Sequence, residues 1–305
     1  MMRLAVTLGD PRGIGPEVTR KALADARVQQ VAAALDITWV LVGPEGTVVP
    51  VDESIGVWDA TGDPRVDMPR AGTLAGLAVA RATALALSGA VQGMVTAPLD
   101  KAALHAGGYD YPGHTEMLGA LAGVPTTMML ASDRLRVVLA TTHVPLREVP
   151  VLLTAQAIAQ AADATREGLR SGFGIAAPRI ALCALNPHAG DGGRFGTEDE
   201  TVLAPAARAA GIAGPFPADT VFVRAMRGEF DAVIAPYHDV GMTAIKVASF
   251  GEAVNVTLGL PFVRTSPDHG TALDIAGQGI ASPESMVAAM MLAATLVSRR
   301  TSALG

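Results

Sequence analysis

The sequence contains a single cysteine, and this scarcity excludes two kinds of site. Cys183 is the one cysteine among 305 residues. One cysteine cannot form an intramolecular disulfide, and it cannot supply a cluster of thiolate ligands for a metal. Cys183 lies in the apolar run 180–185. We therefore expect a small buried hydrophobic side chain and not a nucleophile.

The sequence also lacks an excess of positive charge and a long apolar run. There are 23 Lys and Arg against 29 Asp and Glu, which gives a formal net charge of −6 and no electrostatic reason to expect a nucleic-acid partner. The most apolar late stretch, residues 286–297, is shorter than the roughly 20 residues that a membrane span needs. The apolar run that ends at Leu8 is too short for a signal peptide. We expect a cytoplasmic protein without a membrane partner.

What the sequence does contain is an alternation of two hydrophobic patterns. Short runs rich in β-forming residues predict strands at 4–8, 38–42, 93–96, 127–130, 137–141, 180–185, 232–235 and 254–258. Longer stretches of helical period predict helices at 17–35, 74–87, 151–169, 198–210 and 285–297. This alternation predicts an α/β protein with a mostly parallel sheet covered on both faces. Residues 44–70, rich in Gly, Pro and Asp, are expected to form an excursion with short strands.

Three of the six histidines, His143, His188 and His238, come directly after predicted strands. The carboxyl ends of parallel strands form the ligand-binding edge of such a sheet. Three imidazoles there resemble a catalytic metal site, which needs about three protein ligands and an open position. Asp239 would add an oxygen ligand or orient the neighbouring imidazole. The alternative is that each histidine is a separate polar residue with local hydrogen bonds.

A second group of residues is a candidate for binding an anion. His114 and Thr115 lie at a turn into a helix, where free N–H groups and the helix dipole favour an anion, although an ordinary helix cap explains them too. Lys246, Asn255 and Arg264 lie in or beside apolar stretches. A charge in such a setting needs a partner, which is either an anionic substrate or an internal carboxylate.

Two glycine-rich segments follow strands. Residues 9–17 open a helix as a phosphate loop would, but they do not match the dinucleotide fingerprint G-x-G-x-x-G. Residues 268–279 have glycines that allow close backbone approach, and there His269 and Asp274 could contact adenine and ribose. Taken alone, this second segment could be a surface turn.

Taken in order, eight motifs resemble the 4-hydroxythreonine-4-phosphate dehydrogenase family of pyridoxal phosphate biosynthesis. They occupy residues 9–17, 96–101, 112–116, 141–146, 186–190, 217–220, 237–239 and 264–279. The segment 268–279 is also similar to the adenosine-binding loop of isocitrate and isopropylmalate dehydrogenases. The resemblance implies two α/β/α domains with a central cleft. It places a cofactor-binding domain at 1–120 plus 256–305, and a domain with the metal ligands and dimer contacts at 121–255.

The resemblance also implies a role for individual residues. It implies a homodimer with a shared active site, a small phosphorylated substrate, NAD or NADP, and a divalent metal, with zinc placed before magnesium or cobalt. The metal ligands would be His143, His188 and His238, and the substrate ligands His114, Thr115, Lys246, Asn255 and Arg264. The cofactor would contact His269, Gly270, Thr271, Ala272 and Asp274. Lys101, Asp219 and Asp239 are the candidates for proton transfer or support of the site.

The sequence departs from the family pattern in two places. The stretch between about residues 42 and 72 is short, and Asp239-Val240-Gly241 replaces Asp-Gln-Gly. Both departures bear on the substrate more than on the chemistry, which we expect to be oxidation with decarboxylation of 4-phosphohydroxy-L-threonine or a relative. A cis-dihydrodiol dehydrogenase of aromatic-acid catabolism is the nearest alternative. A zinc hydrolase and a non-catalytic phosphate-binding protein would both leave the 268–279 segment unexplained.

Overall fold

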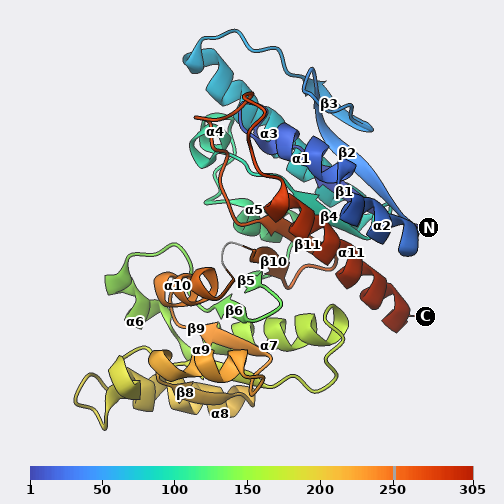
Figure 1. Ribbon diagram of the computed structural model, residues 1–305. Coiled ribbons are helices and arrows are strands. Elements are labelled where there is room, and N and C mark those ends of the chain that lie inside the picture. The colour runs from blue at the N-terminus through green and yellow to red at the C-terminus, as the bar shows by residue number, and fades with distance from the viewer. Residues whose placement is uncertain (250–251, 305) are drawn as a thin grey trace. The chain divides into compact units, whose positions relative to one another are not determined.

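The chain divides into two compact units. The structure, a computed structural model, describes residues 1–249 and 252–304 (Figure 1). Unit 1 comprises Met1–Thr126 and Leu260–Gly305, and unit 2 comprises Thr127–Gly259. The family resemblance implies boundaries at 120/121 and 255/256, a few residues before these. Among the described residues, no helix is both long and apolar enough to cross a membrane.

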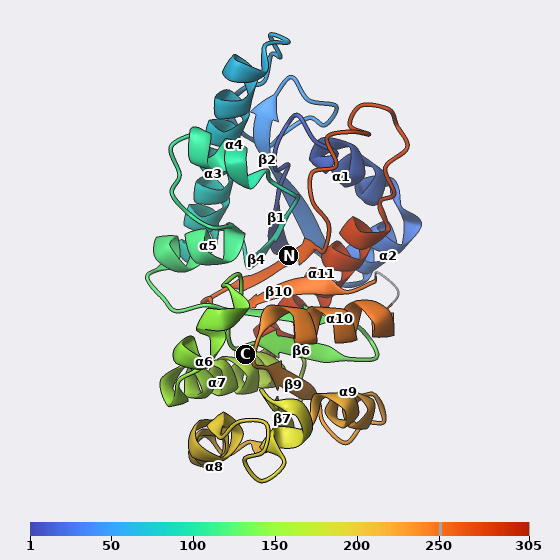
Figure 2. The same cartoon turned by 90° about the vertical axis from the view of Figure 1, so that its left-hand side faces the viewer.

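Unit 1 is a parallel sheet with helices on both faces. Its strands follow the order β3-β2-β1-β4-β11, with bounds β1 (Met2–Thr7), β2 (Ile37–Glu45), β3 (Glu53–Val57), β4 (Gly93–Thr96) and β11 (Val263–Pro267). One face carries α3 (Pro64–Leu87), α4 (Lys101–Ala106) and α5 (His114–Ala122), and the other carries α1 (Gly15–Ala24), α2 (Ala26–Ala34) and α11 (Glu284–Leu304) (Figure 2).

Unit 2 repeats this layering around a mixed sheet. Its strands follow the order β10-β5-β6-β9-β7-β8, with bounds β5 (Thr127–Ala131), β6 (Arg136–Leu139), β7 (Ile180–Cys183), β8 (Ala213–Phe216), β9 (Ala232–Ala235) and β10 (Val254–Leu258). The pairs β10–β5 and β5–β6 are antiparallel, and the others are parallel. One face carries α7 (Ala155–Ser171) and α8 (Ala204–Ala210), and the other carries α9 (Ala218–Met226) and α10 (His238–Ser249). The short helix α6 (Val149–Leu152) precedes α7.

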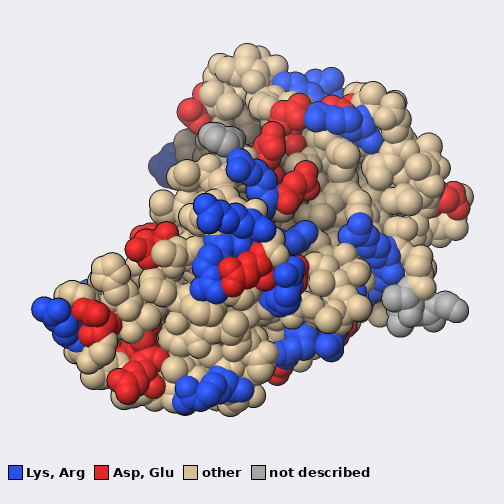
Figure 3. Space-filling view, turned by 60° about the horizontal axis from the view of Figure 1, so that its bottom comes forward, with Lys and Arg blue, Asp and Glu red and all other residues tan. Residues whose placement is uncertain are grey.

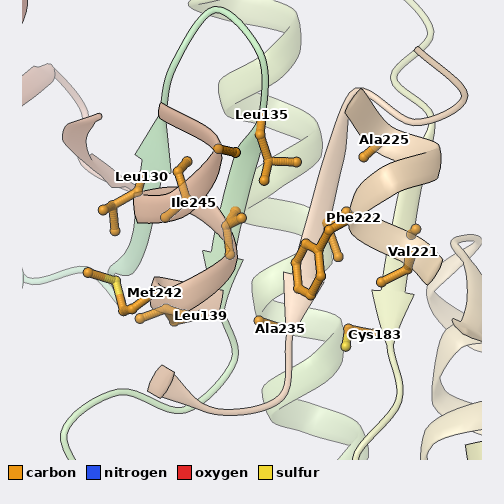
Figure 4. Packing of buried hydrophobic residues seen from close by; sticks show 14 of the residues in the cluster. Leu130, Leu135, Leu139, Cys183, Val221, Phe222, Ala225, Ala235, Met242 and Ile245 are labelled. Carbon is orange, nitrogen blue, oxygen red and sulfur yellow. The ribbon is translucent and has the colours of Figure 1, made fainter. Parts of the chain in front are cut away.

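A single apolar layer joins α9 and α10 to the unit 2 sheet (Figure 4). Val137 and Leu139 of β6 belong to this layer, because residues two apart on a strand face the same side. Ile245 of α10 and Val221 of α9 are fully buried in the same layer. Because His238 is the first residue of α10, this packing also fixes where that histidine stands.

Helix boundaries depart from the sequence prediction in several places, and in two of them a capping aspartate explains the difference. The predicted helix 17–35 is two helices, because Asp25 is extended and its side chain accepts a hydrogen bond from Arg27 N to begin α2. The predicted helix 74–87 begins ten residues earlier, at Pro64, where Asp63 caps the first turn. Asp67 adds to this start by accepting hydrogen bonds from Thr61 N and Gly62 N. Part of the segment predicted as an excursion is therefore helix.

The charged side chains of both signs are interspersed with uncharged residues over the face shown in Figure 3. Several charged side chains of the protein are paired, including Arg224 with Glu229 and Arg81 with Glu53. Exposed pairs of this kind contribute about 0 to 1 kcal/mol each. Folding therefore depends on buried apolar packing more than on these ion pairs.

We predict that Ile245→Ala lowers the free energy of unfolding by about 2 to 5 kcal/mol, because it opens a cavity in a fully buried layer. Val247→Ala, on the same helix but 69% exposed, should change it by less than about 0.5 kcal/mol. Denaturant unfolding followed by circular dichroism measures both. Equal effects of the two substitutions would contradict the packing described here.

Candidate functional site

In unit 1, three loops meet at the carboxyl ends of β1, β4 and β11. The glycine loop (residues 9–15) lies between the other two: Asp10 N donates to Pro98 O at 3.0 Å, and Ile14 N donates to Thr271 O at 2.9 Å. A Cβ on Gly9 would lie 2.1 Å from Pro98 O, and one on Gly13 would lie 2.8 Å from Thr271 O. Only glycine allows these approaches. The loop thus joins the two segments that carry candidate ligands.

Most backbone N–H groups of the glycine loop are already engaged, within the loop or with its two neighbours. Arg12 N donates to Asp10 Oδ1, and Gly13 N donates to Asp10 O. The fully buried Asp10 carboxylate also accepts hydrogen bonds from Nε and Nη2 of Arg12, at 3.0 and 2.6 Å. With the N–H groups of Asp10, Arg12, Gly13 and Ile14 all engaged, this loop is an architectural connector and not a cradle for phosphate.

A cationic cluster forms beside the glycine loop, around Arg264 of β11. The Arg264 side chain is 1% exposed, and its Nη2 and Nε donate to Thr96 Oγ1 at 2.7 and 3.2 Å. Burial lowers the pKa of Arg264 to about 9, while Glu116 acts in the opposite direction. The guanidinium therefore keeps its charge at neutral pH, and it is held by Thr96, the last residue of β4.

His114, the first residue of α5, belongs to the same cluster. Its Nε2 is buried and has no hydrogen-bond partner within the part of the chain that the structure describes. Burial, and then the charges of Arg264 and Lys101, hold the pKa of His114 well below its usual range. A neutral imidazole, two cations and the N-terminus of α5, where Thr115 lies, can together bind an anion. Unit 1 thus brings His114, Thr115, Arg264 and Lys101 together.

The 268–281 loop, which connects β11 to α11, carries the candidate cofactor residues. His269 Nδ1 lies 3.0 Å from Gly270 O and so donates to it, which leaves Nε2 as an acceptor. That Nε2 is buried, and no partner for it is found among the described residues. A Cβ on Gly270 would meet nothing within 4 Å. A buried acceptor beside open space fits a polar group of a nucleotide. Thr271, Ala272 and Asp274 follow in the same loop, Asp274 being exposed.

In unit 2, the candidate metal ligands follow three adjacent parallel strands, β6, β9 and β7. His143 and His238 form a pair whose ring centroids are 5.2 Å apart. The hydrogen bond from Thr141 Oγ1 to Pro236 O, at 2.8 Å, ties their two loops together. Imidazole nitrogens about 2.1 Å from one ion at roughly tetrahedral angles place the ring centroids about 5 Å apart. This pair therefore fits a divalent metal.

Asp239 orients one member of the pair. His238 Nδ1 lies 2.7 Å from Asp239 Oδ1. A carboxylate in this position holds the proton on Nδ1, so that Nε2 keeps its lone pair for a metal. Asp239 is itself 87% exposed, which leaves its other oxygen open to solvent or substrate.

His188 stands apart from the pair. It is exposed and opens a left-handed turn, with φ of +54° at His188, +55° at Ala189 and +44° at Asp191. Buried Asp199 supports this turn by accepting hydrogen bonds from Leu185 N and Asn186 N. Across residues 1–249 and 252–304, no three His, Cys, Asp or Glu side chains are placed to hold one metal ion. Of the three predicted metal ligands, His143 and His238 thus lie together, whereas His188 lies apart from them.

The other candidates lie in different settings. Asn255 of β10 has a buried Oδ1 without a partner among the described residues. Lys246 of α10 is exposed, whereas its apolar neighbours in sequence had suggested a buried charge; the helical period turns it away from the core that Ile245 enters. Asp219 is exposed at the start of α9, in unit 2 with Asp239, whereas Lys101 belongs to unit 1.

Some residues that hold a candidate ligand or its loop in place could not be identified from the sequence. Thr96 lay in a quoted motif without a role, yet it accepts both bonds of Arg264. Asp199 and Asp10 were not singled out either, because a carboxylate that bonds backbone groups has no spacing signature. Cys183 is confirmed as a buried hydrophobic residue, and burial raises its pKa to about 12.

Comparison with known proteins gives consistent matches over nearly the whole chain. The family model described as pyridoxal phosphate biosynthetic protein PdxA matches residues 7–293. A 4-hydroxythreonine-4-phosphate dehydrogenase of Paracoccus denitrificans is 43% identical, covering 97% of this chain and 98% of the relative. The crystal structure of the enzyme of that name from Klebsiella pneumoniae is 39% identical, with a TM-score of 0.79 and coverage of 97% and 100%. A terephthalate 1,2-cis-dihydrodiol dehydrogenase from Burkholderia xenovorans is 29% identical, with a TM-score of 0.64 and coverage of 96% and 98%.

We predict that His114 makes the fold sensitive to acid. Its pKa is lower in the folded chain than the value of about 6.5 in the unfolded chain, so the unfolded chain binds the proton first as the pH falls. The stability is therefore complete above about pH 6.5 and is lost below it, at up to about 1.4 kcal/mol per pH unit. His114→Asn should reduce this loss in denaturant unfolding at about pH 7 and pH 5. His105→Asn, at an exposed histidine, should not. The same loss in wild type and His114→Asn would contradict the assignment.

Proposed function

This chain belongs to the pyridoxal phosphate biosynthetic protein PdxA family, and on that premise we propose that it oxidises a CH–OH group of 4-phosphohydroxy-L-threonine or a closely related phosphorylated hydroxy acid. The observation that carries the proposal is the cationic cluster of unit 1. There the buried Arg264, the neutral His114 and Lys101 surround the N-terminus of α5. A phosphate group offers the charge and the acceptor oxygens that suit the guanidinium, the ammonium and the backbone N–H groups of this helix terminus.

The hydride acceptor in this proposal is NAD or NADP. The cofactor, when bound, takes the hydride as CH–OH becomes C=O, and one proton leaves the hydroxyl. The 268–281 loop would hold it, with the buried Nε2 of His269 and the open space at Gly270 as support. If the product is a β-keto acid, loss of carbon dioxide leaves the bonding electrons on the α-carbon, which is then protonated.

A divalent metal is the second expected cofactor. His143 and His238 would hold it with His188 as the third ligand, and when bound it would stabilise negative charge on the substrate oxygen. Asp239 keeps Nε2 of His238 available for it. The hydroxyl proton would pass to one of Lys101, Asp219 and Asp239. Because His188 lies apart from the histidine pair among the described residues, we propose a homodimer in which the metal site is shared.

The second candidate function is that of a cis-dihydrodiol dehydrogenase, supported by the 29% identical structure of that activity. Both reactions oxidise a CH–OH group, so the difference lies in what the cationic cluster binds. A zinc hydrolase, by contrast, gives the 268–281 loop no role.

We predict that the wild type reduces NAD or NADP when 4-phosphohydroxy-L-threonine and a divalent metal are present. His238→Ala should lower kcat by roughly 10²- to 10³-fold, because several kcal/mol of charge stabilisation are lost. His105→Ala, at an exposed histidine of α4, should leave it unchanged. Absorbance of the reduced nicotinamide measures all three. Turnover with a cis-dihydrodiol alone would show that the proposed substrate is wrong. An absence of turnover with either nicotinamide cofactor would refute the proposed dehydrogenase activity.

We also predict that Arg264→Lys lowers kcat/KM for the phosphorylated substrate by roughly 10²-fold, because lysine lacks the forked donors that hold both Thr96 and an anion. Arg3→Lys, at an exposed arginine of β1, is the matched control and should have no effect. Steady-state kinetics measure both. If Arg264→Lys is as active as wild type, the cluster does not bind phosphate.

A further inference from the structure

Two residues of α1 hold the far end of the 268–281 loop. Lys21 Nζ donates to Gly279 O at 2.9 Å, to Ala281 O at 2.7 Å and to Glu17 Oε1 at 2.7 Å. Glu17 Oε1 also accepts a hydrogen bond from Ala281 N at 3.0 Å. The Glu17 side chain is only 9% exposed, and the hydrogen bond from Lys21 lowers its pKa. These residues are one turn apart, so a single helix face presents both charges to the loop.

The near end of the same loop is held by the glycine loop. Ile14 N donates to Thr271 O, and Gly13 lies so close to Thr271 that a Cβ would be 2.8 Å from that oxygen. Ile14 directly precedes α1, whose first residue is Gly15. Both ends of the loop are therefore attached to one rigid body, namely α1 and the residues just before it.

Between these two attachments the loop has little structure of its own. Its internal hydrogen bonds are Ile275 N to Ala272 O, Gln278 N to Ile275 O and Gln278 Nε2 to Asp274 O. It forms neither helix nor strand, and most of residues 272–280 are exposed or half-buried. A segment with so few contacts takes its position from its ends.

We propose that Lys21 and Glu17 are positioning residues for the nicotinamide cofactor: they hold the 268–281 loop in the conformation that binds the nucleotide. This inference rests on the proposed function, which assigns the loop to the cofactor. Lys21 itself is not a ligand. An ammonium has three donors, and all three are engaged by Glu17, Gly279 and Ala281. Its contribution to binding is the ordering of the loop before the nucleotide arrives.

The test compares Lys21→Met, which keeps the length of the stem and removes the ammonium, with Arg20→Met on the same helix. Arg20 is exposed, so its substitution removes a charge without touching the loop. Lys21→Met should raise the Kd for the nicotinamide cofactor and its KM by about tenfold. It should leave kcat at saturating cofactor, and KM for the phosphorylated substrate, within about twofold of wild type, since uniform binding alone is lost. Arg20→Met should match wild type.

A second readout needs no cofactor. In the protein without nucleotide, amide hydrogen exchange over residues 272–280 should be at least about tenfold faster in Lys21→Met than in wild type or Arg20→Met, while strand β4 exchanges unchanged. Lys21→Arg, which can still donate to the two carbonyls, should restore most of the protection and the cofactor affinity. This variant keeps the test decisive if Lys21→Met folds poorly.

The outcomes separate the inference from the proposed function. If the wild type is active and Lys21→Met shows unchanged cofactor affinity, the inference fails and the proposed function stands. An equal loss of affinity for cofactor and phosphorylated substrate would also overturn the inference, since it indicates a general loss of structure. If the wild type neither binds nor reduces any nicotinamide, the proposed function fails first, and the inference fails with it.

Discussion

The close approach of the glycine loop to its two neighbours is the constraint on which the unit 1 site depends. Asp10 N reaches the loop after β4, and Ile14 N reaches the loop after β11. Both contacts need a backbone without Cβ atoms, at Gly9 and Gly13. The strands themselves lie side by side through ordinary parallel pairing, but pairing does not position the loops at their ends. The glycine loop therefore holds the loop after β4 and the loop after β11 in fixed positions. The first leads to Lys101 of the cationic cluster, and the second is the 268–281 loop.

The two units use electrostatics in different ways. In unit 1, burial keeps His114 neutral beside the charged Arg264. The cluster therefore attracts anions, and no third positive charge repels its two cations. In unit 2, the exposed His143 and the half-buried His238 stand as paired imidazoles, and Asp239 sets the tautomer of the second. The first arrangement suits a phosphate and the second suits a divalent cation.

Much of the fold could be predicted, because long runs of β-forming and helical patterns carry their own signal. Several missed elements are short: β8 and β11 have four and five residues, and α4 has six. The longer helices α9 and α10, of nine and twelve residues, were missed as well. The start of α3 was missed because Pro64 and Pro69 suggested a coil, whereas Asp63 and Asp67 stabilise that turn. Lys246 was expected in apolar surroundings from its neighbours in sequence, but the helical period of α10 exposes it.

By itself, the sequence determined the α/β alternation, the buried character of Cys183 and the position of three histidines after three strands. These properties are local, since they depend on hydrophobic period and on the order of residues along the chain. Only the tertiary structure decided that His143 and His238 form a pair while His188 stands on a separate left-handed turn. It also decided that Thr96 receives Arg264 and that Lys21 reaches Gly279, contacts that span 168 and 258 residues. Such contacts depend on which strands become neighbours in the sheet, and the pairing of distant segments leaves no period in the sequence.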